Sequence, residues 1–188
     1  QMRSWKKRNP DLFIHIEPGS FPSPLPLSHL LDLIPEIPAD SLGMNEDELK
    51  MAFGSLRGSA YQKLQDSWQE RIQAALSLHE RLGISRVAVH TRDCIFSIMR
   101  EGVISAREEI SALEKGVDAA ASLAAGMKME ELPCLMNEKG LCAVEDLLSQ
   151  GAAEIGRGAS LFSEGRVLSL TPSRQVKKPV IIKKIMMN

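Results

Sequence analysis

The sequence predicts an α/β fold, in which helices cover both faces of a β-sheet. Short apolar runs such as residues 84–90 alternate with longer segments of helical periodicity such as residues 105–125, and this alternation is typical of a parallel sheet. The chain has 188 residues, of which 44% are apolar and 25% are charged, which is typical of globular proteins. A chain of this length can bury one hydrophobic core.

The N-terminal part predicts two short strands around a proline-rich segment. Residues 12–17 are rich in β-branched and aromatic residues and lie between Asn-Pro-Asp and Pro-Gly, which indicates a buried strand. Six prolines between Pro18 and Pro38 allow a loop and one or two helical turns, followed by a second strand that ends at residues 40–44.

Helical periodicity begins at Asn45, which is a favourable N-cap residue followed by three acidic residues in the first turn. A longer helix is expected over about residues 59–82, with Gly83 as its end. Strands are then expected at residues 84–90 and 94–99, joined by a polar turn at residues 91–93.

The C-terminal part predicts two further helices, over about residues 105–125 and 140–155. Several glycines then predict a loose segment, and late strands are expected at residues 167–170 and 180–182.

Composition excludes several classes of protein. A net charge of −1 argues against a nucleic-acid binder, because phosphate binding depends on concentrated Lys and Arg. No apolar run is long enough to span a membrane, and no signal peptide is recognisable, so we expect a cytoplasmic protein. Cys94, Cys134 and Cys142 lack metal-ligand spacing, which predicts reduced structural thiols.

Three polar pairs fall at the expected carboxyl ends of strands, where ligands bind in open α/β sheets. His15 and Glu17 alternate in phase and share a face, so they either hold a hydrated cation or form a core histidine–carboxylate pair. Asn45 and Glu48 are three residues apart, which suits water-mediated Mg²⁺ binding or simple helix capping.

The third pair, His90 and Arg92, also shares a face. Arg92 could clamp a phosphate and His90 could contact a nucleotide, but a surface ion pair of Arg92 explains the spacing equally well. The sequence contains no P-loop, no Gly-x-Gly-x-x-Gly fingerprint and no Gly-x-Ser-x-Gly motif, so the commonest nucleotide-binding and hydrolase signatures are absent.

Four segments, taken in order, resemble the archaeal ADP-dependent phosphofructokinase/glucokinase family, which has a ribokinase-like fold with three layers. The matching segments are Phe-Ile-His-Ile-Glu-Pro-Gly-Ser (13–20), Asp-Ser-Leu-Gly-Met-Asn-Glu-Asp-Glu-Leu (40–49), Val-Ala-Val-His-Thr-Arg-Asp (87–93) and Leu-Thr-Pro-Ser-Arg-Gln-Val-Lys-Lys-Pro-Val (170–180).

The resemblance implies a kinase that transfers the β-phosphate of ADP to fructose 6-phosphate or glucose in a modified glycolysis, giving AMP and a sugar phosphate. It implies that Glu17 and Glu48 are the carboxylates of a Mg²⁺ site, with His15 and Asn45 in support. It also implies that His90 and Arg92 contact the nucleotide, and that the segment containing Val176 and Val180 lines the adenine pocket.

The sequence departs from the family at two places. The family's Gly-x-Gly-Asp motif, which carries the catalytic base, should follow Val180, but residues 181–188 contain neither Gly nor Asp. The strands and lid domain that precede this region in the family are also missing. We therefore expect residues 1–188 to be part of the large nucleotide-binding domain, with a non-family tail at residues 183–188.

This departure predicts a chain without measurable kinase activity, because the base and the anion-binding glycines are lost together. The alternative is a non-catalytic nucleotide-binding or regulatory module of the same fold. A related kinase that uses ATP is disfavoured, because the His-x-Glu motif resembles the ADP-dependent branch. The sequence does not indicate an oligomeric state.

Overall fold

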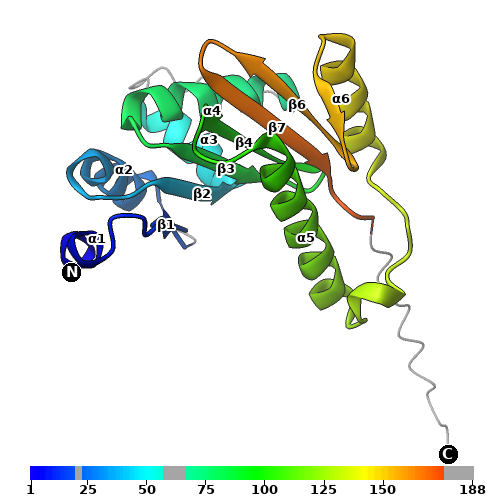
Figure 1. The fold of residues 1–188 in the computed structure, drawn as a ribbon, viewed down its shortest axis with the longest axis horizontal. Helices are drawn as coiled ribbons and strands as arrows, with labels where there is room; N and C mark the ends of the chain where they lie inside the picture. The colour runs from blue at the N-terminus through cyan, green and yellow to red at the C-terminus, as the bar shows by residue number, and fades with distance from the viewer. Residues whose placement is uncertain (20–22, 57–66, 176–188) are drawn as a thin grey trace, which may run out of the picture.

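A seven-stranded mixed sheet forms the centre of the computed structural model, which describes residues 1–19, 23–56 and 67–175 (Figure 1). The strand order is β1-β2-β3-β4-β7-β6-β5. The strands are β1 (His15–Ile16), β2 (Ser41–Asn45), β3 (Arg86–His90), β4 (Cys94–Arg100), β5 (Ala153–Ile155), β6 (Gly158–Ser163) and β7 (Arg166–Pro172).

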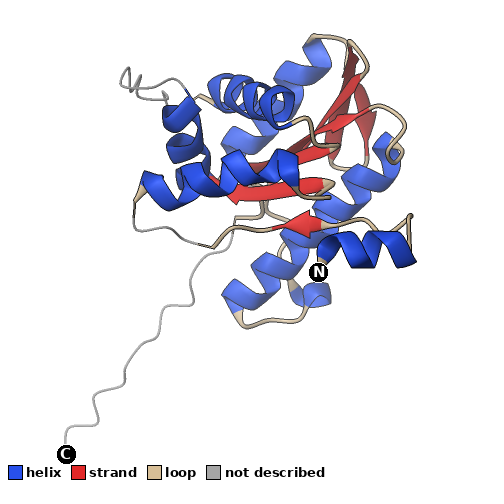
Figure 2. Ribbon diagram, turned by 90° about the vertical axis from the view of Figure 1, so that its left-hand side faces the viewer, coloured by secondary structure: helices blue, strands red, loops and turns tan. Residues whose placement is uncertain are grey.

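Helices lie on both sides of this sheet, which confirms the predicted three-layer α/β arrangement (Figure 2). Helices α3, α4 and α6 pack on one face, α2 packs on α3, and α5 covers the other face against β4 to β7 (Figure 1). The helices are α1 (Met2–Arg8), α2 (Pro24–Leu33), α3 (Glu46–Leu56), α4 (Trp68–Leu82), α5 (Ala106–Ala125) and α6 (Glu138–Ser149), with 3-10 turns η1 (Ile34–Glu36) and η2 (Met129–Glu131).

The main core fills the space between the sheet and the layer of α3, α4 and α6. Alternate residues of each strand face this layer, as Leu42 and Met44 of β2 and Val87 and Val89 of β3 do, and all four are fully buried. Fully buried Phe96 of β4 continues the same row. The strand ends are therefore positioned by a close-packed core.

The expected parallel sheet is found only in part. Strands β1, β2 and β3 pair in parallel, but β4, β7, β6 and β5 each pair antiparallel with their neighbours. The turn of residues 91–93 between β3 and β4 is too short for a crossover, so it makes a hairpin. Strands β6 and β7 are joined through Glu164 and Gly165, which both have positive φ, as tight hairpin turns require.

Two further expectations are corrected by the structure. Helix α6 ends at Ser149 rather than near Ile155, because Gly151 turns with a φ of 91° and residues 153–155 pair with β6. The glycine-rich segment contains β5 and β6, and Gly158 is required there because a Cβ would collide with the Leu170 carbonyl oxygen. The basic N-terminal residues form α1, whose Lys6 pairs with Asp40 at 2.8 Å.

Two N-terminal expectations are also corrected. The strand expected at residues 12–17 is formed only by His15–Ile16 and is not buried. The one or two helical turns expected after Pro18 are a ten-residue helix, α2.

The other expected elements agree with the structure, or lie outside the described residues. Helix α5 begins after Ser105 with a capping box and ends before Gly126, close to the expected bounds. Helix α4 begins at Trp68 with Ser67 as its N-cap, whereas its expected start near Ser59 and the expected strand at residues 180–182 are not described. Within the described residues, no helix has the length and apolar character that crossing a membrane requires.

His79 predicts a pH-dependent stability. Burial on α4 lowers the pKa of His79, the charges of Arg166 and Arg100 lower it further, and a hydrogen bond with the Ser85 backbone opposes the shift. In the unfolded chain His79 binds a proton as the pH falls through the ordinary histidine pKa of about 6.5, whereas in the folded chain it binds the proton only at lower pH. The free energy of unfolding should therefore fall as the pH drops below about 6.5, by up to about 1.4 kcal/mol per pKa unit of difference.

Urea unfolding between pH 5 and pH 8 measures this dependence. His79→Leu should reduce the dependence of the free energy of unfolding on pH. His29→Gln, on the exposed side of α2, should leave this dependence as in the wild type. If the free energy of unfolding of His79→Leu depended on pH as strongly as that of the wild type, His79 would not be the cause of the dependence.

Candidate functional site

The predicted polar residues meet at one edge of the sheet, where the parallel strands β1, β2 and β3 end. Asn45 at the end of β2 pairs in register with His90 at the end of β3. His15 lies in β1, and Glu17 follows that strand directly. The N-terminus of α3 begins at this same edge, immediately after β2. Three strands and one helix therefore bring their polar ends together.

The Glu17 carboxylate lies between two imidazole rings. Its Oε2 is 3.2 Å from His15 Nε2, and its Oε1 is 3.0 Å from His90 Nε2. The side chain of Glu17 is 50% exposed, so the carboxylate remains accessible to a ligand. His15 and Glu17 share a face as the spacing predicted, but the contact between Glu17 and His90 joins residues far apart in the sequence.

Gly43 makes room for this cluster, and the sequence reasoning missed its role. A Cβ built on Gly43 would collide with Glu17 Oε2 and would lie 2.8 Å from His15 Nε2. A glycine inside a strand often marks such a close approach, which is the signal that could have identified it.

Behind the cluster lies a second group of polar residues that spacing did not indicate. Ser41 Oγ is 2.9 Å from His15 Nδ1 and accepts a hydrogen bond from Arg86 Nη1 at 3.1 Å. Arg86 Nη2 in turn donates to Glu109 Oε1 on α5 at 2.7 Å. The site therefore connects to the opposite helical layer through buried polar groups.

Asn45 and Glu48 form a reciprocal cap at the start of α3. The Glu48 amide donates to Asn45 Oδ1 at 2.9 Å, and the Asn45 amide donates to Glu48 Oε2 at 2.8 Å. Glu48 is only 3% exposed. The capping alternative is therefore realised, and the role of Glu48 at a metal site stays a prediction.

His90 and Arg92 lie between two hollows at the strand ends. One is polar and lies against α3, where its lining includes Glu46 and Lys50. The other lies against α5, where Ala120, Ala124 and other small residues form its wall. Among the described residues Arg92 forms no ion pair, so the alternative of a surface ion pair is not seen there.

A buried arginine lies between two acidic residues that line the polar hollow. Arg71 of α4 is 5% exposed at its side chain, donates to Glu46 at 2.7 Å, and has Asp93 3.7 Å away. Cys94 lies nearby and is buried, and burial raises the pKa of its thiol to about 11. This thiol is protonated at neutral pH, in agreement with the structural role expected for Cys94.

The residue types at this edge fit a magnesium ion, although they do not form a closed cage. Among the described residues, no group of three or more His, Cys, Asp or Glu side chains could hold a metal alone. Mg²⁺ keeps several waters and uses one or two carboxylates together with substrate phosphates. The half-exposed Glu17 carboxylate suits that mode of binding. Val176 and Val180, expected at the adenine pocket, lie outside the described residues.

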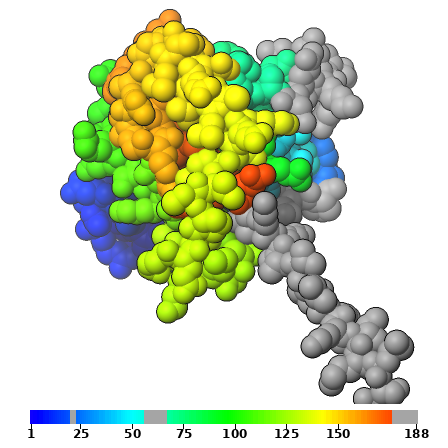
Figure 3. Space-filling view, turned by 90° about the vertical axis from the view of Figure 1, so that its right-hand side faces the viewer, coloured from blue at the N-terminus to red at the C-terminus, as the bar shows by residue number. Residues whose placement is uncertain are grey.

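The residues that follow β7 reach the surface beside α6 and the segment of residues 126–137 (Figure 3). Arg174 follows β7, and its Nε donates to Asp118 of α5 at 2.5 Å. This hydrogen bond holds the pKa of Asp118 below its ordinary value, and Arg157 adds a second donor. The chain is therefore held in place at Arg174, just before residues 176–180.

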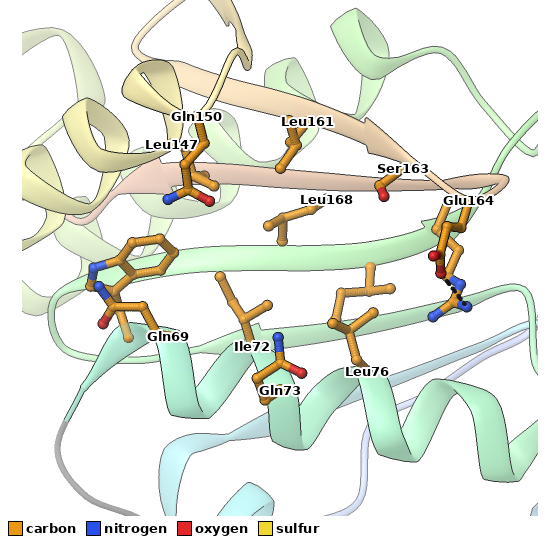
Figure 4. Close-up of a pocket in the computed structure, with 13 residues that line it drawn as sticks. Gln69, Ile72, Gln73, Leu76, Leu147, Gln150, Leu161, Ser163, Glu164 and Leu168 are labelled. Carbon is orange, nitrogen blue, oxygen red and sulfur yellow. Dashed lines mark ion pairs between the residues drawn. The ribbon is translucent and has the colours of Figure 1, made fainter.

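A separate hollow lies between α4 and α6 and has a different character (Figure 4). Its floor is apolar and includes Leu161 and Leu168, and glutamines such as Gln73 and Gln150 lie at its rim. Arg166 at one end is paired with Glu80 at 2.7 Å. This hollow contains none of the predicted site residues.

Comparison with known proteins gives a consistent result. The conserved region of the ADP-specific phosphofructokinase/glucokinase family matches residues 1–180. None of the curated proteins matches the chain.

Solved structures of ADP-dependent kinases share the fold. An ADP-dependent kinase in complex with fructose-6-phosphate and ADPβS has a TM-score of 0.76 and 22% identity, over 95% of this chain and 43% of that one. The last common ancestor of ADP-dependent phosphofructokinases from Methanosarcinales has a TM-score of 0.72 and 20% identity, over 95% and 41%. A phosphofructokinase from Pyrococcus horikoshii with AMP has a TM-score of 0.69 and 22% identity, over 96% and 40%.

These likenesses confirm the expected ribokinase-like fold. The chain spans less than half the length of each of these solved structures.

Gly43→Ala tests the geometry of the cluster. The added methyl group should displace the Glu17 and His15 side chains toward solvent, so the contacts of Glu17 with both rings are lost. Because flexible, half-exposed side chains give way, the free energy of unfolding should change by less than about 1 kcal/mol. A crystal structure and urea unfolding of the variant measure both effects.

Gly19→Ala is the matched control, because a Cβ at Gly19 meets nothing within 4 Å. A Gly43→Ala structure in which Glu17 still lies between the two rings would show that the glycine is not required.

Proposed function

The chain belongs to the ADP-specific phosphofructokinase/glucokinase family, and from this we propose that it forms the nucleotide-binding part of an ADP-dependent sugar kinase. One observation carries the proposal. The Glu17 carboxylate lies between His15 and His90 at the carboxyl ends of the parallel strands, beside a hollow that also contains Arg92. A carboxylate for a cation and an arginine for a phosphate are the groups that a magnesium nucleotide needs.

In this proposal each residue has a distinct task. Glu17 and Glu48 are the carboxylates of a Mg²⁺ site, oriented by His15 and Asn45. Arg92, which is exposed, binds a phosphate, and His90 lies against the nucleotide. Val176 and Val180 line the adenine pocket. Mg²⁺, when bound, neutralises phosphate charge and so favours phosphoryl transfer.

The protein groups contribute orientation. The Asn45 amide fixes one oxygen of Glu48, so this buried carboxylate has a defined direction. The N-terminus of α3 lies at the strand ends, where the helix dipole favours negative charge. Phosphoryl transfer depends mainly on such positioning and on charge stabilisation.

The complete reaction would transfer the β-phosphate of ADP to fructose 6-phosphate or glucose, giving AMP and a sugar phosphate in a modified glycolysis. The three cysteines are free, which fits a reducing cytoplasmic compartment.

A second candidate function is nucleotide binding without transfer. Residues 181–188 contain neither Gly nor Asp, so this chain lacks the Gly-x-Gly-Asp base that the family resemblance places after Val180. The histidine–carboxylate cluster is nevertheless intact. We therefore expect these 188 residues to bind Mg²⁺ and ADP and to form no AMP when sugar is added.

Calorimetry with ADP in the presence of Mg²⁺ or of EDTA tests the proposal. The wild type should bind ADP, and Glu17→Gln should weaken the Mg²⁺-dependent affinity at least tenfold, because it removes the charge but keeps the shape. Glu48→Gln should act in the same direction, since its amide oxygen still accepts from the Asn45 amide and preserves the helix cap.

Glu145→Gln on the exposed side of α6 serves as the control and should bind as the wild type does. Absence of ADP binding by the folded wild type, or equal affinity in Glu17→Gln, would contradict the proposal. Comparison of ADP with ATP measures whether the site prefers the diphosphate.

A further inference from the structure

A buried ion pair joins the sheet to α5 directly behind the candidate site. Arg86 of β3 donates to Glu109 Oε1 through Nε at 2.9 Å and through Nη2 at 2.7 Å. The side chain of Glu109 is 2% exposed and that of Arg86 is 15% exposed. Burying such a pair costs desolvation energy that its attraction often fails to recover, so stability alone is weak grounds for its presence.

The third guanidinium nitrogen of Arg86, Nη1, makes a contact on the side of the candidate site. This nitrogen donates to Ser41 Oγ at 3.1 Å, and Ser41 is fully buried. The same hydroxyl oxygen is 2.9 Å from His15 Nδ1. A continuous line of polar contacts therefore runs from α5 through β3 and β2 to β1.

The hydrogen atoms that each group carries determine which group donates and which accepts along this line of contacts. A guanidinium group can only donate, so Ser41 Oγ is the acceptor in its contact with Arg86. The Ser41 hydroxyl hydrogen then needs an acceptor, and among the described residues this acceptor is His15 Nδ1. Any other arrangement leaves a buried hydroxyl hydrogen without a partner, which costs about 1–3 kcal/mol.

A neutral imidazole that accepts at Nδ1 carries its proton on Nε2. His15 Nε2 faces Glu17 Oε2 at 3.2 Å, so this proton points at the carboxylate. The direction of the His15 Nε2–H donor is thus set by groups on the neighbouring strands β2 and β3 and on α5.

We propose that Arg86 and Glu109 are positioning residues, which orient the Ser41 hydroxyl, place the His15 proton on Nε2 and thereby hold the Glu17 carboxylate in its direction. Neither residue touches a ligand in this account. The effect on Mg²⁺ and ADP rests on the proposed function, whereas the effect on His15 does not.

The experiment compares two variants that break the line at different points. Ser41→Ala removes the hydroxyl and leaves the ion pair. The double variant Arg86→Met/Glu109→Leu removes both charges together, because removing one would leave the other buried and unpaired. Arg166→Met/Glu80→Leu, which removes an ion pair of 2.7 Å outside this line, is the matched control.

Long-range ¹H–¹⁵N NMR of the histidine rings, recorded in mildly alkaline solution, reports which nitrogen of each neutral ring carries the proton. Wild type and control should show His15 protonated at Nε2, whereas Ser41→Ala and the double variant should show a mixture of both tautomers. Cooperative urea unfolding confirms that each variant is folded. In calorimetry, both variants should bind Mg²⁺ and ADP at least fivefold more weakly than the control.

Two results would overturn the inference, namely a wild-type His15 protonated at Nδ1, or folded variants that keep the wild-type tautomer. These NMR readings need no ligand, so they separate the inference from the proposed function. If the tautomer changes in the variants but the wild type binds no ADP, the positioning of His15 stands and the proposed function fails.

Discussion

The parallel pairing of β1, β2 and β3 determines where the polar groups of the candidate site lie. Its register places His15 beside Ser41, Ser41 beside Arg86, and Asn45 beside His90. Because side chains alternate between faces, a shift of one residue would move His15 and Ser41 to opposite faces of the sheet. Gly43, in the same strand as Ser41, leaves the space that Glu17 occupies.

Contacts from both helical layers hold this edge of the sheet in place. On one side, buried Arg71 of α4 links Glu46 at the start of α3 to Asp93 in the β3–β4 turn. On the other side, Asp118 of α5 fixes Arg174 at the end of β7. These contacts within the fold fix the positions of the polar groups at this edge, and such pre-organisation reduces the entropy that binding would cost.

Local patterns predicted those parts of the fold that depend on neighbours in sequence. The alternation of His15 and Glu17 and the capping role of Asn45 followed from the periods of a strand and a helix. The antiparallel half of the sheet was not predicted, because glycines such as Gly158 resemble loop residues until the strand that they contact is known. The links from Ser41 to Arg86 and from Arg86 to Glu109 join residues 45 and 23 positions apart, and spacing does not reveal such contacts.

The central claim is that His15 and His90 flank the carboxylate that receives a magnesium nucleotide. The four histidines of the chain provide its most direct test, because His15 and His90 lie at the strand ends while His29 and His79 lie on α2 and α4. Titration of the wild type with ADP and Mg²⁺, followed by NMR of the imidazole rings, measures all four together. The account predicts that the His15 and His90 resonances shift and that those of His29 and His79 do not. Unchanged His15 and His90 resonances at saturating ADP and Mg²⁺ would contradict it.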